Sequence, residues 1–388
     1  MNFDLTAEQQ SLVISVAQMC SRFDDSYWRE RDRLHEFPWD FYTMFAEGGW
    51  LGITVPEEFG GGGLGILEAA LVLEEIAASG AAMNGASAIH LTVFGMNPVV
   101  KHGSQEMKEH YLPQVVDGSL HVCFGVTEPD AGSDTTRIRT VATRTDTGYV
   151  ISGRKVWTSK ALECSKVILL TRTTPREECR KPTDGMTLFL ADLDPNHCTI
   201  RPIEKMGRNA VDSNELYIDE LPVPISDRVG EEGRGFRHLL DSLNPERILL
   251  AHEAIGIGRA AINRAVSYAN ERVVFGRPIG ANQAISFPLA IAQAQIDAAR
   301  LLARKAATLY DAGQPCATEA NQAKYLCAEA GYYAADRAVQ THGGFGYATE
   351  YDVERYFREA RLLRLVPIAQ ELVLAYLSEH GLGLPRGY

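Results

Sequence analysis

The sequence predicts a multi-domain α+β protein in which a helical domain, a strand-rich domain and a second helical domain follow one another. Three observations support this order. The composition is helical over residues 1–120, runs rich in Val, Thr and Ile fill residues 121–232, and long helical patterns return over residues 233–388. A chain of 388 residues is also too long for one simple core and fits two or three domains.

The first segment carries a helix start signal. Thr6 and Gln9 have the spacing of a capping box, and the apolar residues that follow at helical spacing are Leu12, Val16, Met19 and Phe23. Residues 64–78 and 106–116 also have helical composition. We therefore expect an N-terminal helical domain over residues 1–120.

The middle segment has the pattern of several short strands. The runs are separated by turn residues such as Asp146 and Gly148, and they cover residues 138–144, 149–157, 166–172, 186–193, 199–203 and 215–221. Short strands at this spacing predict a small antiparallel β-barrel or sandwich over residues 121–232.

Four long helices account for the last segment. The expected ranges are 236–273, 285–312, 319–342 and 353–379, and the short links between them are typical of a four-helix bundle. Alternating strand–helix–strand units are absent from the pattern, which disfavours a Rossmann nucleotide-binding fold.

The bulk composition excludes several classes of function. With 45% apolar and 23% charged residues the chain reads as a soluble globular protein, and its net charge of −12 argues against general nucleic-acid binding. No apolar run approaches the ~20 residues that span a bilayer. The first ten residues lack the basic and apolar parts of a secretory signal, so we expect a cytoplasmic protein without membrane insertion. Neither the seven cysteines nor the histidines form a metal-ligand cluster, so no metal is expected.

Residues 124–134 form the first candidate binding segment. Thr127, Ser133 and the backbone N–H groups of a loop that contains Pro129 and Gly132 can hydrogen-bond a planar heterocycle. The alternative is a polar connection between two strands.

Trp157, Thr158 and Ser159 form the second. A tryptophan ring can lie flat against an aromatic cofactor, and a hydroxyl two residues further along a strand points to the same side. The alternative is an ordinary core tryptophan.

Two further segments follow the ends of predicted helices. Arg272, with Phe275 and Gln283 beyond it, offers a guanidinium that suits a pyrophosphate. Gln340 precedes Gly343 and Gly344, whose missing Cβ atoms let a phosphate or adenine approach the backbone. The alternative is a helix C-cap plus a surface arginine.

In this order, over about residues 3–380, the four segments resemble the acyl-CoA dehydrogenase family of flavoenzymes. The resemblance implies that the cofactor is FAD. The residues implied to contact the flavin ring are Phe124, Val126, Thr127, Gly132, Ser133, Trp157, Thr158 and Ser159. It also implies that the ADP half of FAD is held across a subunit boundary by Arg272, Phe275, Gln283, Gln340, Gly343 and Gly344. Ser133 would meet the CoA chain as well. The implied reaction converts an acyl-CoA to its trans-2-enoyl-CoA in a homotetramer that passes electrons to an electron-transfer flavoprotein.

The position of the catalytic base departs from the common family pattern. Pro367 stands where most members carry the glutamate, whereas residues 244–247, Asn-Pro-Glu-Arg, resemble the members related to isovaleryl- and long-chain acyl-CoA dehydrogenases. This resemblance assigns Glu246 as the base and Asn244 and Arg247 to the CoA moiety. Burial among leucines and isoleucines would raise the pKa of Glu246 towards that of a general base. The alternative for Glu246 is a surface residue near a helix start, and Glu371 is the fallback base.

Pro367 also lacks the backbone N–H that polarises the thioester carbonyl in the family. This feature favours a second hypothesis, a flavin oxidase or monooxygenase on the same fold. A third hypothesis is a catalytically silent assembly protein that binds FAD or CoA.

Overall fold

The computed structural model describes residues 4–387; residues 1–3 and 388, at the outer ends of the first and last predicted domains, lie outside the described residues. The first region is helical, as expected. Thr6 and Gln9 form the predicted capping box, in which each side chain bonds the other's backbone N–H. The helices are α1 (Ala7–Cys20), α2 (Asp25–Leu34), α3 (Trp39–Glu47), α4 (Ile66–Ile76), α5 (Ala82–Gly95), α6 (Asn97–His102) and α7 (Gln105–Val116).

The middle region is a β-sheet. Its strands are β1 (Val122–Gly125), β2 (Val141–Arg144), β3 (Gly148–Ser159), β4 (Lys166–Arg172), β5 (Met186–Asp192), β6 (Cys198–Pro202), β7 (Ser213–Pro224) and β8 (Arg228–Val229). Their order is β6-β7-β3-β2-β4-β5-β8, with β1 beside β4.

The sheet corrects two details of the prediction. Among the described strands no pairing joins β6 to β8, so the sheet stays open and the expected barrel is not closed. The sheet is also mixed, because β1 runs parallel to β4 and β2 meets β4 in a parallel pair. Strand β8 has only two residues, which is too short to carry the hydrogen-bond ladder round to β6.

Three long helices form the last region: α8 (Gly235–Glu271), α9 (Gln283–Asp311) and α10 (Ala317–His342). A small hairpin of β9 (Val273–Val274) and β10 (Arg277–Pro278) joins α8 to α9. The expected fourth helix over residues 353–379 is divided into α11 (Val353–Leu362) and α12 (Gln370–Tyr376). Pro367 explains the break, since it lacks an N–H and disfavours helical backbone at the residue before it.

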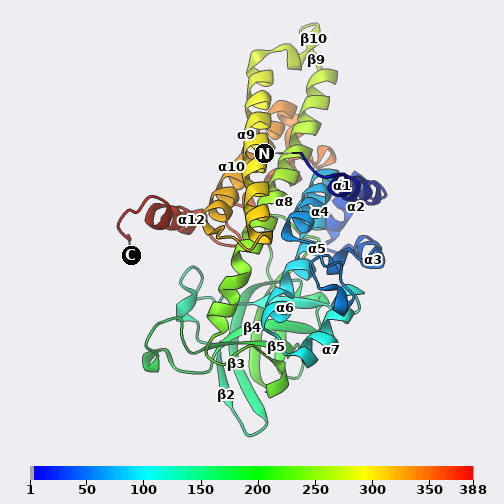
Figure 1. Ribbon diagram of the computed structural model, residues 1–388. Coiled ribbons are helices and arrows are strands. Elements are labelled where there is room, and N and C mark those ends of the chain that lie inside the picture. Colours follow the sequence, from blue (N-terminus) through cyan, green and yellow to red (C-terminus); the bar gives the residue numbers. More distant parts are fainter. Residues whose placement is uncertain (1–3, 388) are drawn as a thin grey trace.

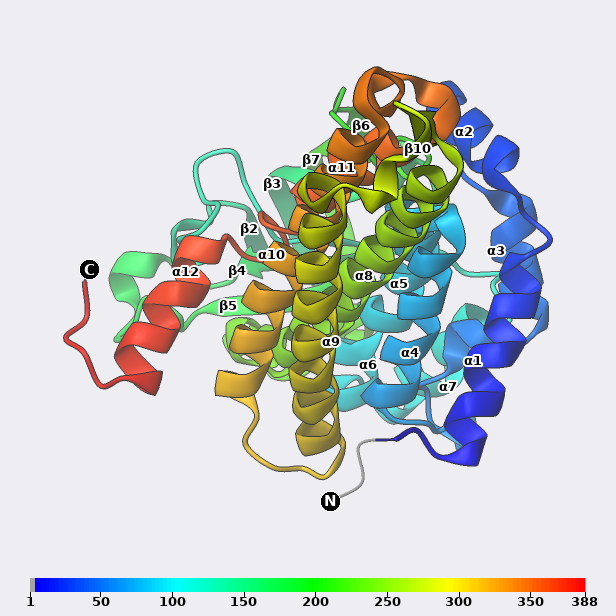
Figure 2. The same cartoon turned by 90° about the horizontal axis from the view of Figure 1, so that it is seen from above.

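Helix α8 lies at the centre of the molecule. It packs on α4 and α5 on one side and on α9 and α10 on the other, as the view along the bundle shows (Figure 2). Gly258 and Gly331 allow α8 and α10 to approach closely, because a Cβ on Gly331 would lie 2.4 Å from the Ala254 carbonyl oxygen. One apolar core therefore runs from the N-terminal helices into the bundle.

Candidate active site

The carboxyl group of Glu246 lies on α8, close to the helices of the N-terminal region. The side chain is half-buried, and no hydrogen bond to it is found within residues 4–387. Burial raises the pKa of Glu246 to about 7, while the charges of His90 and Arg247 oppose this rise and that of Glu253 adds to it. A carboxylate with this pKa can accept a proton near neutral pH.

The two predicted CoA-contacting residues flank this glutamate. Nη1 of Arg247 donates to Oδ1 of Asn244 at 3.0 Å, one turn back along α8. Asn244 also lines a cleft of about 340 Å³ together with Lys101 and Tyr310. Both residues therefore lie beside Glu246, and Asn244 reaches the surface.

A buried His–Glu pair near Glu246 was not predicted from the sequence. Nδ1 of His90, on α5, lies 2.6 Å from Oε1 of Glu253, on α8, and both side chains are buried. The charge of Glu253 raises the pKa of His90 against the effect of burial, and the charge of Glu246 acts in the same direction. One sequence signal could have found the pair: Glu253 is ionisable within an otherwise apolar run and lies seven residues from Glu246, on the same helix face.

Arg208 connects this region to the sheet. It lies between β6 and β7 in a left-handed backbone conformation (φ 58°). Its Nη2 donates to Oγ of Ser159 at 2.8 Å and to Oγ of Ser213 at 2.7 Å. The charge of Arg208 also acts on the His90–Glu253 pair. Arg208 thus binds the predicted flavin-edge residue Ser159 by a hydrogen bond and acts through its charge on the His90–Glu253 pair near Glu246.

Trp157 occupies an irregular position in β3. The pairing with β7 shifts between Lys155 and Thr158, and Trp157 takes a φ of 62°, which is strained for a non-glycine residue. Its side chain is 57% exposed, so it is not an ordinary core tryptophan. Thr158 points inward, with a buried Oγ1 that has no hydrogen-bond partner among the described residues. This bulge turns a large aromatic face outward.

The loop that follows β1 is held against β3. The Val156 N–H donates to the Thr127 carbonyl at 2.9 Å, and Nζ of Lys155 reaches the Val126 carbonyl at 3.2 Å. Lys155 is fully buried and also pairs with Glu128 at 2.8 Å.

The remaining residues of this segment divide between two environments. Phe124 contacts Phe94 of α5, with ring centroids 5.6 Å apart. Gly132 and Ser133 are exposed. The predicted flavin residues Val126 and Thr127 therefore lie beside β3, the strand that carries residues 157–159.

The other predicted cofactor residues lie at the opposite end of the bundle. Arg272 lies between the end of α8 and β9, and Phe275 lies in the turn of the β9–β10 hairpin, which Figure 1 shows far from the sheet. Gln283 begins α9. Gln340 lies in the last turn of α10, and Gly343 and Gly344 follow its end at the same tip. Arg272 follows Glu246 by 26 positions, roughly 39 Å along α8. One chain therefore does not bring the two predicted halves of the FAD site together.

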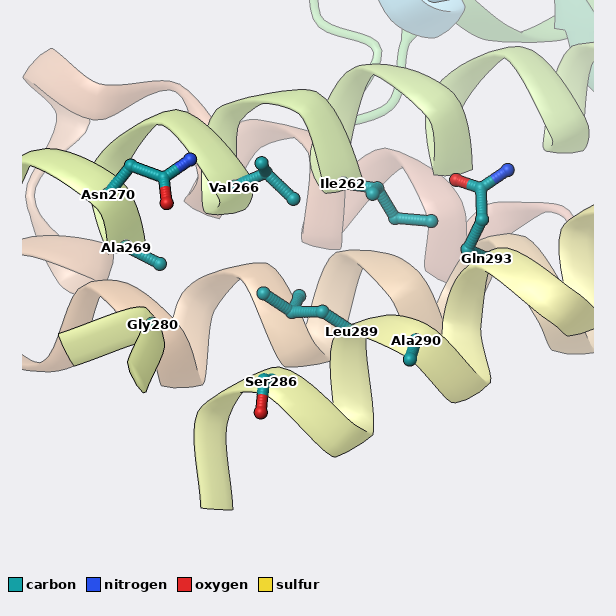
Figure 3. A pocket seen from close by; sticks show the side chains of 9 residues that line it. All are labelled: Ile262, Val266, Ala269, Asn270, Gly280, Ser286, Leu289, Ala290 and Gln293. Atoms are coloured by element: carbon teal, nitrogen blue, oxygen red, sulfur yellow. The ribbon is translucent and has the colours of Figure 1, made fainter. Parts of the chain in front are cut away.

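A cavity near this tip lies between α8 and α9 (Figure 3). Its volume is about 300 Å³, and its lining is mostly apolar, with Ile262 and Val266 of α8 opposite Leu289 of α9. None of its nine lining residues is titratable, so it supplies no proton acceptor.

The fallback base lies elsewhere. Glu371 is exposed at the start of α12, and its charge acts on the buried amino group of Lys324. Glu371 does not contribute to the pKa of Glu246. Pro367 lies in the link between α11 and α12, as described above.

Comparison with known proteins decides the family. Models of the N-terminal, middle and C-terminal domains of acyl-CoA dehydrogenases match residues 6–119, 123–221 and 233–367. The chain belongs to the acyl-CoA dehydrogenase family. It is 38% identical over 392 aligned positions to the acyl-CoA dehydrogenase fadE12 of Mycobacterium bovis, which covers all of this chain and 99% of that protein.

Two solved structures of acyl-CoA dehydrogenases have the same fold. The glutaryl-coenzyme A dehydrogenase–glutaryl-CoA complex superposes with a TM-score of 0.94 at 30% identity, covering 100% of this chain and 98% of that one. Butyryl-CoA dehydrogenase from Megasphaera elsdenii gives 0.93 at 31% identity, covering 98% and 100%. The chain is therefore an oxidoreductase of this family, and FAD is the family's cofactor.

The geometry fits FAD. Trp157 presents an exposed ring, on which the flat face of a heterocycle can stack. At the tip, Gly343 has a φ of 60°, and a Cβ added to it or to Gly344 would meet nothing within 4 Å. This open backbone can accept a phosphate or an adenine. No group of three or more possible metal ligands, and no helix able to cross a bilayer, occurs within residues 4–387.

Proposed function

We propose that this chain catalyses the α,β-dehydrogenation of an acyl-CoA thioester to the trans-2-enoyl-CoA. Glu246 is the base that removes the α-proton, and Asn244 and Arg247 contact the CoA moiety. Bound FAD supplies the acceptor for the hydride that leaves the β-carbon. The domains are residues 1–120, 121–232 and 233–388.

The observation that carries this proposal is the half-buried carboxyl of Glu246, whose pKa is about 7. The carboxylate has no hydrogen-bond partner among the described residues, so its proton-accepting oxygens are free for a substrate. Glu371, by contrast, is exposed at the start of α12.

The flavin ring lies against Phe124, Val126, Thr127, Gly132, Ser133 and residues 157–159. The ADP half extends to Arg272, Phe275, Gln283, Gln340, Gly343 and Gly344 of a neighbouring chain. The separation of roughly 39 Å along α8 supports this assignment, because it is too long for one FAD to be served by a single chain. The complete exposure of Phe275 (101%) also supports it, since a bare phenylalanine at the tip of a hairpin suits an interface. The assembly is a homotetramer, and it works in the cytoplasm with an electron-transfer flavoprotein as electron acceptor.

Anaerobic mixing with a panel of acyl-CoAs tests the reaction. The purified protein should be yellow, with about one FAD per chain, and at least one acyl-CoA should bleach the flavin. A colourless protein that takes up no added FAD would contradict the proposal.

Pro367 favours a second candidate, an oxidase or monooxygenase, because it cannot donate the usual N–H to the thioester carbonyl. Rapid reoxidation of the reduced flavin by O₂ would support that reaction. Bound flavin that no acyl-CoA bleaches would indicate the silent assembly protein instead.

A further inference from the structure

The inner end of the Glu246 region contains a carboxylate that the fold leaves incompletely satisfied. Oε1 of Glu253 is taken by His90, but Oε2 is buried and has no hydrogen-bond partner among residues 4–387. The whole side chain of Glu253 is 0% exposed. A buried carboxylate oxygen without a donor is costly, so its retention calls for a specific reason.

A neighbouring ion pair, between His252 of α8 and Glu74 of α4, shows a buried carboxylate with both oxygens satisfied. His252 binds Oε2 of Glu74 at 2.8 Å, and Oε1 of Glu74 receives Arg259 at 3.0 Å and Arg300 at 2.6 Å. Both oxygens of Glu74 are therefore used. Glu253, which follows His252 on α8, has one oxygen without a hydrogen-bond partner among the described residues.

His90 also has a free nitrogen. Its Nδ1 is held by Glu253, whereas no hydrogen bond of Nε2 is found in the described part of the chain. With Nδ1 donating to the carboxylate, Nε2 of the protonated ring is a second donor. The pair therefore offers one donor, on His90, and one acceptor, on Glu253.

The position of the pair relative to the base indicates which part of a ligand would reach it. Glu246 and Glu253 are two turns apart on the same face of α8, about 10 Å along the axis. Glu246 is half-buried and Glu253 fully buried, so Glu253 is the deeper of the two. The charges of Glu246 and His90 act on each other, which places the pair and the base in one region. An acyl chain that extends inward from Glu246 along this face of α8 would bring its distal part to the pair.

We infer that His90 and Glu253 recognise a hydroxyl group on the distal part of the acyl chain, so that the substrate class is a hydroxylated acyl-CoA. A hydroxyl can accept from Nε2 of His90 and donate to Oε2 of Glu253 at once. A plain alkyl end would leave both groups unpaired, and a carboxylate end has no hydrogen to donate to Oε2 of Glu253. This inference rests on the proposed function, since it takes Glu246 to be the base.

The test compares matched acyl-CoA series from butanoyl to decanoyl with a methyl, hydroxyl or carboxyl end. The wild-type holoenzyme is assayed by anaerobic flavin bleaching and by calorimetric Kd. At the best length, the hydroxyl form should exceed the methyl form by at least about tenfold in kcat/KM and in affinity. A preference for the methyl or carboxyl form at every length overturns the inference.

Two variants separate recognition from stability. Glu253→Leu should reduce the hydroxyl preference to near one. Glu74→Gln removes the charge of the fully paired carboxylate and should keep the wild-type preference, even though it weakens the fold. If Glu253→Leu fails to retain FAD, His90→Gln replaces it, with the same expected loss of preference. An unchanged preference in the folded variant overturns the inference.

The two readouts also separate the recognition from the proposed reaction. A hydroxyl preference seen in Kd while no acyl-CoA bleaches the flavin contradicts the proposed dehydrogenation but supports the recognition.

Discussion

Tyr268 and His342 stack with their ring centroids 4.2 Å apart and their planes 24° from parallel. Tyr268 lies in the last turn of α8, and His342 is the last residue of α10. The contact fixes the ends of two parallel helices side by side, so Arg272 and the Gln340–Gly344 segment are held at one tip of the bundle. This tip is the part of the chain that we assign to a neighbouring subunit's FAD.

Arg272→Ala should weaken FAD retention and shift the proposed tetramer towards smaller species. The guanidinium has no salt bridge or side-chain hydrogen bond among the described residues, so its removal should not disturb the isolated chain. Flavin content after gel filtration and mass by light scattering measure both effects. Arg277→Ala is the matched control in the same hairpin, because Arg277 already bonds Oδ1 of Asn282 at 2.8 Å. A monomer of either variant that retains one FAD per chain would contradict the assignment of this tip to a neighbouring subunit's FAD.

Glu246→Gln should keep FAD and acyl-CoA binding but slow flavin reduction by at least about 10²-fold, because only the proton acceptor is lost. Stopped-flow bleaching with the best acyl-CoA measures the rate. Glu371→Gln should change it far less. The reverse pattern, with Glu371→Gln inactive and Glu246→Gln near wild type, would move the base to Glu371 at the start of α12.

The rate of flavin reduction should rise with pH, since the base must be ionised and burial raises the pKa of Glu246 to about 7. Between about pH 6 and pH 8 the increase should be about tenfold, and Glu246→Gln should abolish this dependence. A profile that stays flat for the wild type would show that another step limits the rate or that Glu246 is not the base.

The same raised pKa has a consequence for stability. Between about pH 4.5 and pH 7 the folded state holds the Glu246 proton more tightly than the unfolded state, so stability falls as the pH rises through this window. Glu246→Gln removes the cost of the buried charge and should therefore stabilise the protein at about pH 8 by on the order of 1–3 kcal/mol. The gain should disappear near pH 4, and chemical denaturation at both pH values measures it.

Lys155→Met should loosen the loop that carries Val126 and Thr127. The substitution leaves Glu128 buried without its ion pair, for which we expect a loss of about 3 kcal/mol of unfolding free energy and weaker FAD binding. Adding Glu128→Leu should recover part of the loss, because the unpaired charge is then gone. Additive losses in the double variant would show that the pair does not anchor the loop as a unit.

The sequence anticipated the architecture well where local patterns are strong. The capping box at Thr6 and the long helices α8, α9 and α10 follow from spacing and composition, and the helix ends differ from expectation by at most two residues. The open sheet and the divided last helix were not foreseen. Closure of the sheet into a barrel depends on pairing between strands that are distant in sequence. Pro367 breaks the last helix within a segment whose composition is otherwise helical.

The candidate site could likewise be predicted from the sequence only in part. Glu246 could be selected because its neighbours resemble a known motif. His90 and Arg208 could not, because they come from a helix and a loop that are distant in sequence and meet only in the folded chain. The unpaired oxygen of Glu253 is likewise a property of three-dimensional packing that no spacing along the chain reveals.

The distance between Glu246 and the tip of the bundle has a genetic consequence. In a tetramer built as we propose, each reaction centre combines a glutamate from one chain with an arginine from another. Two inactive chains, one carrying Glu246→Gln and the other Arg272→Ala, could then complement each other. When they co-assemble, some centres carry both lesions while others inherit the intact glutamate and the intact arginine, so co-expression would restore activity that neither chain shows alone.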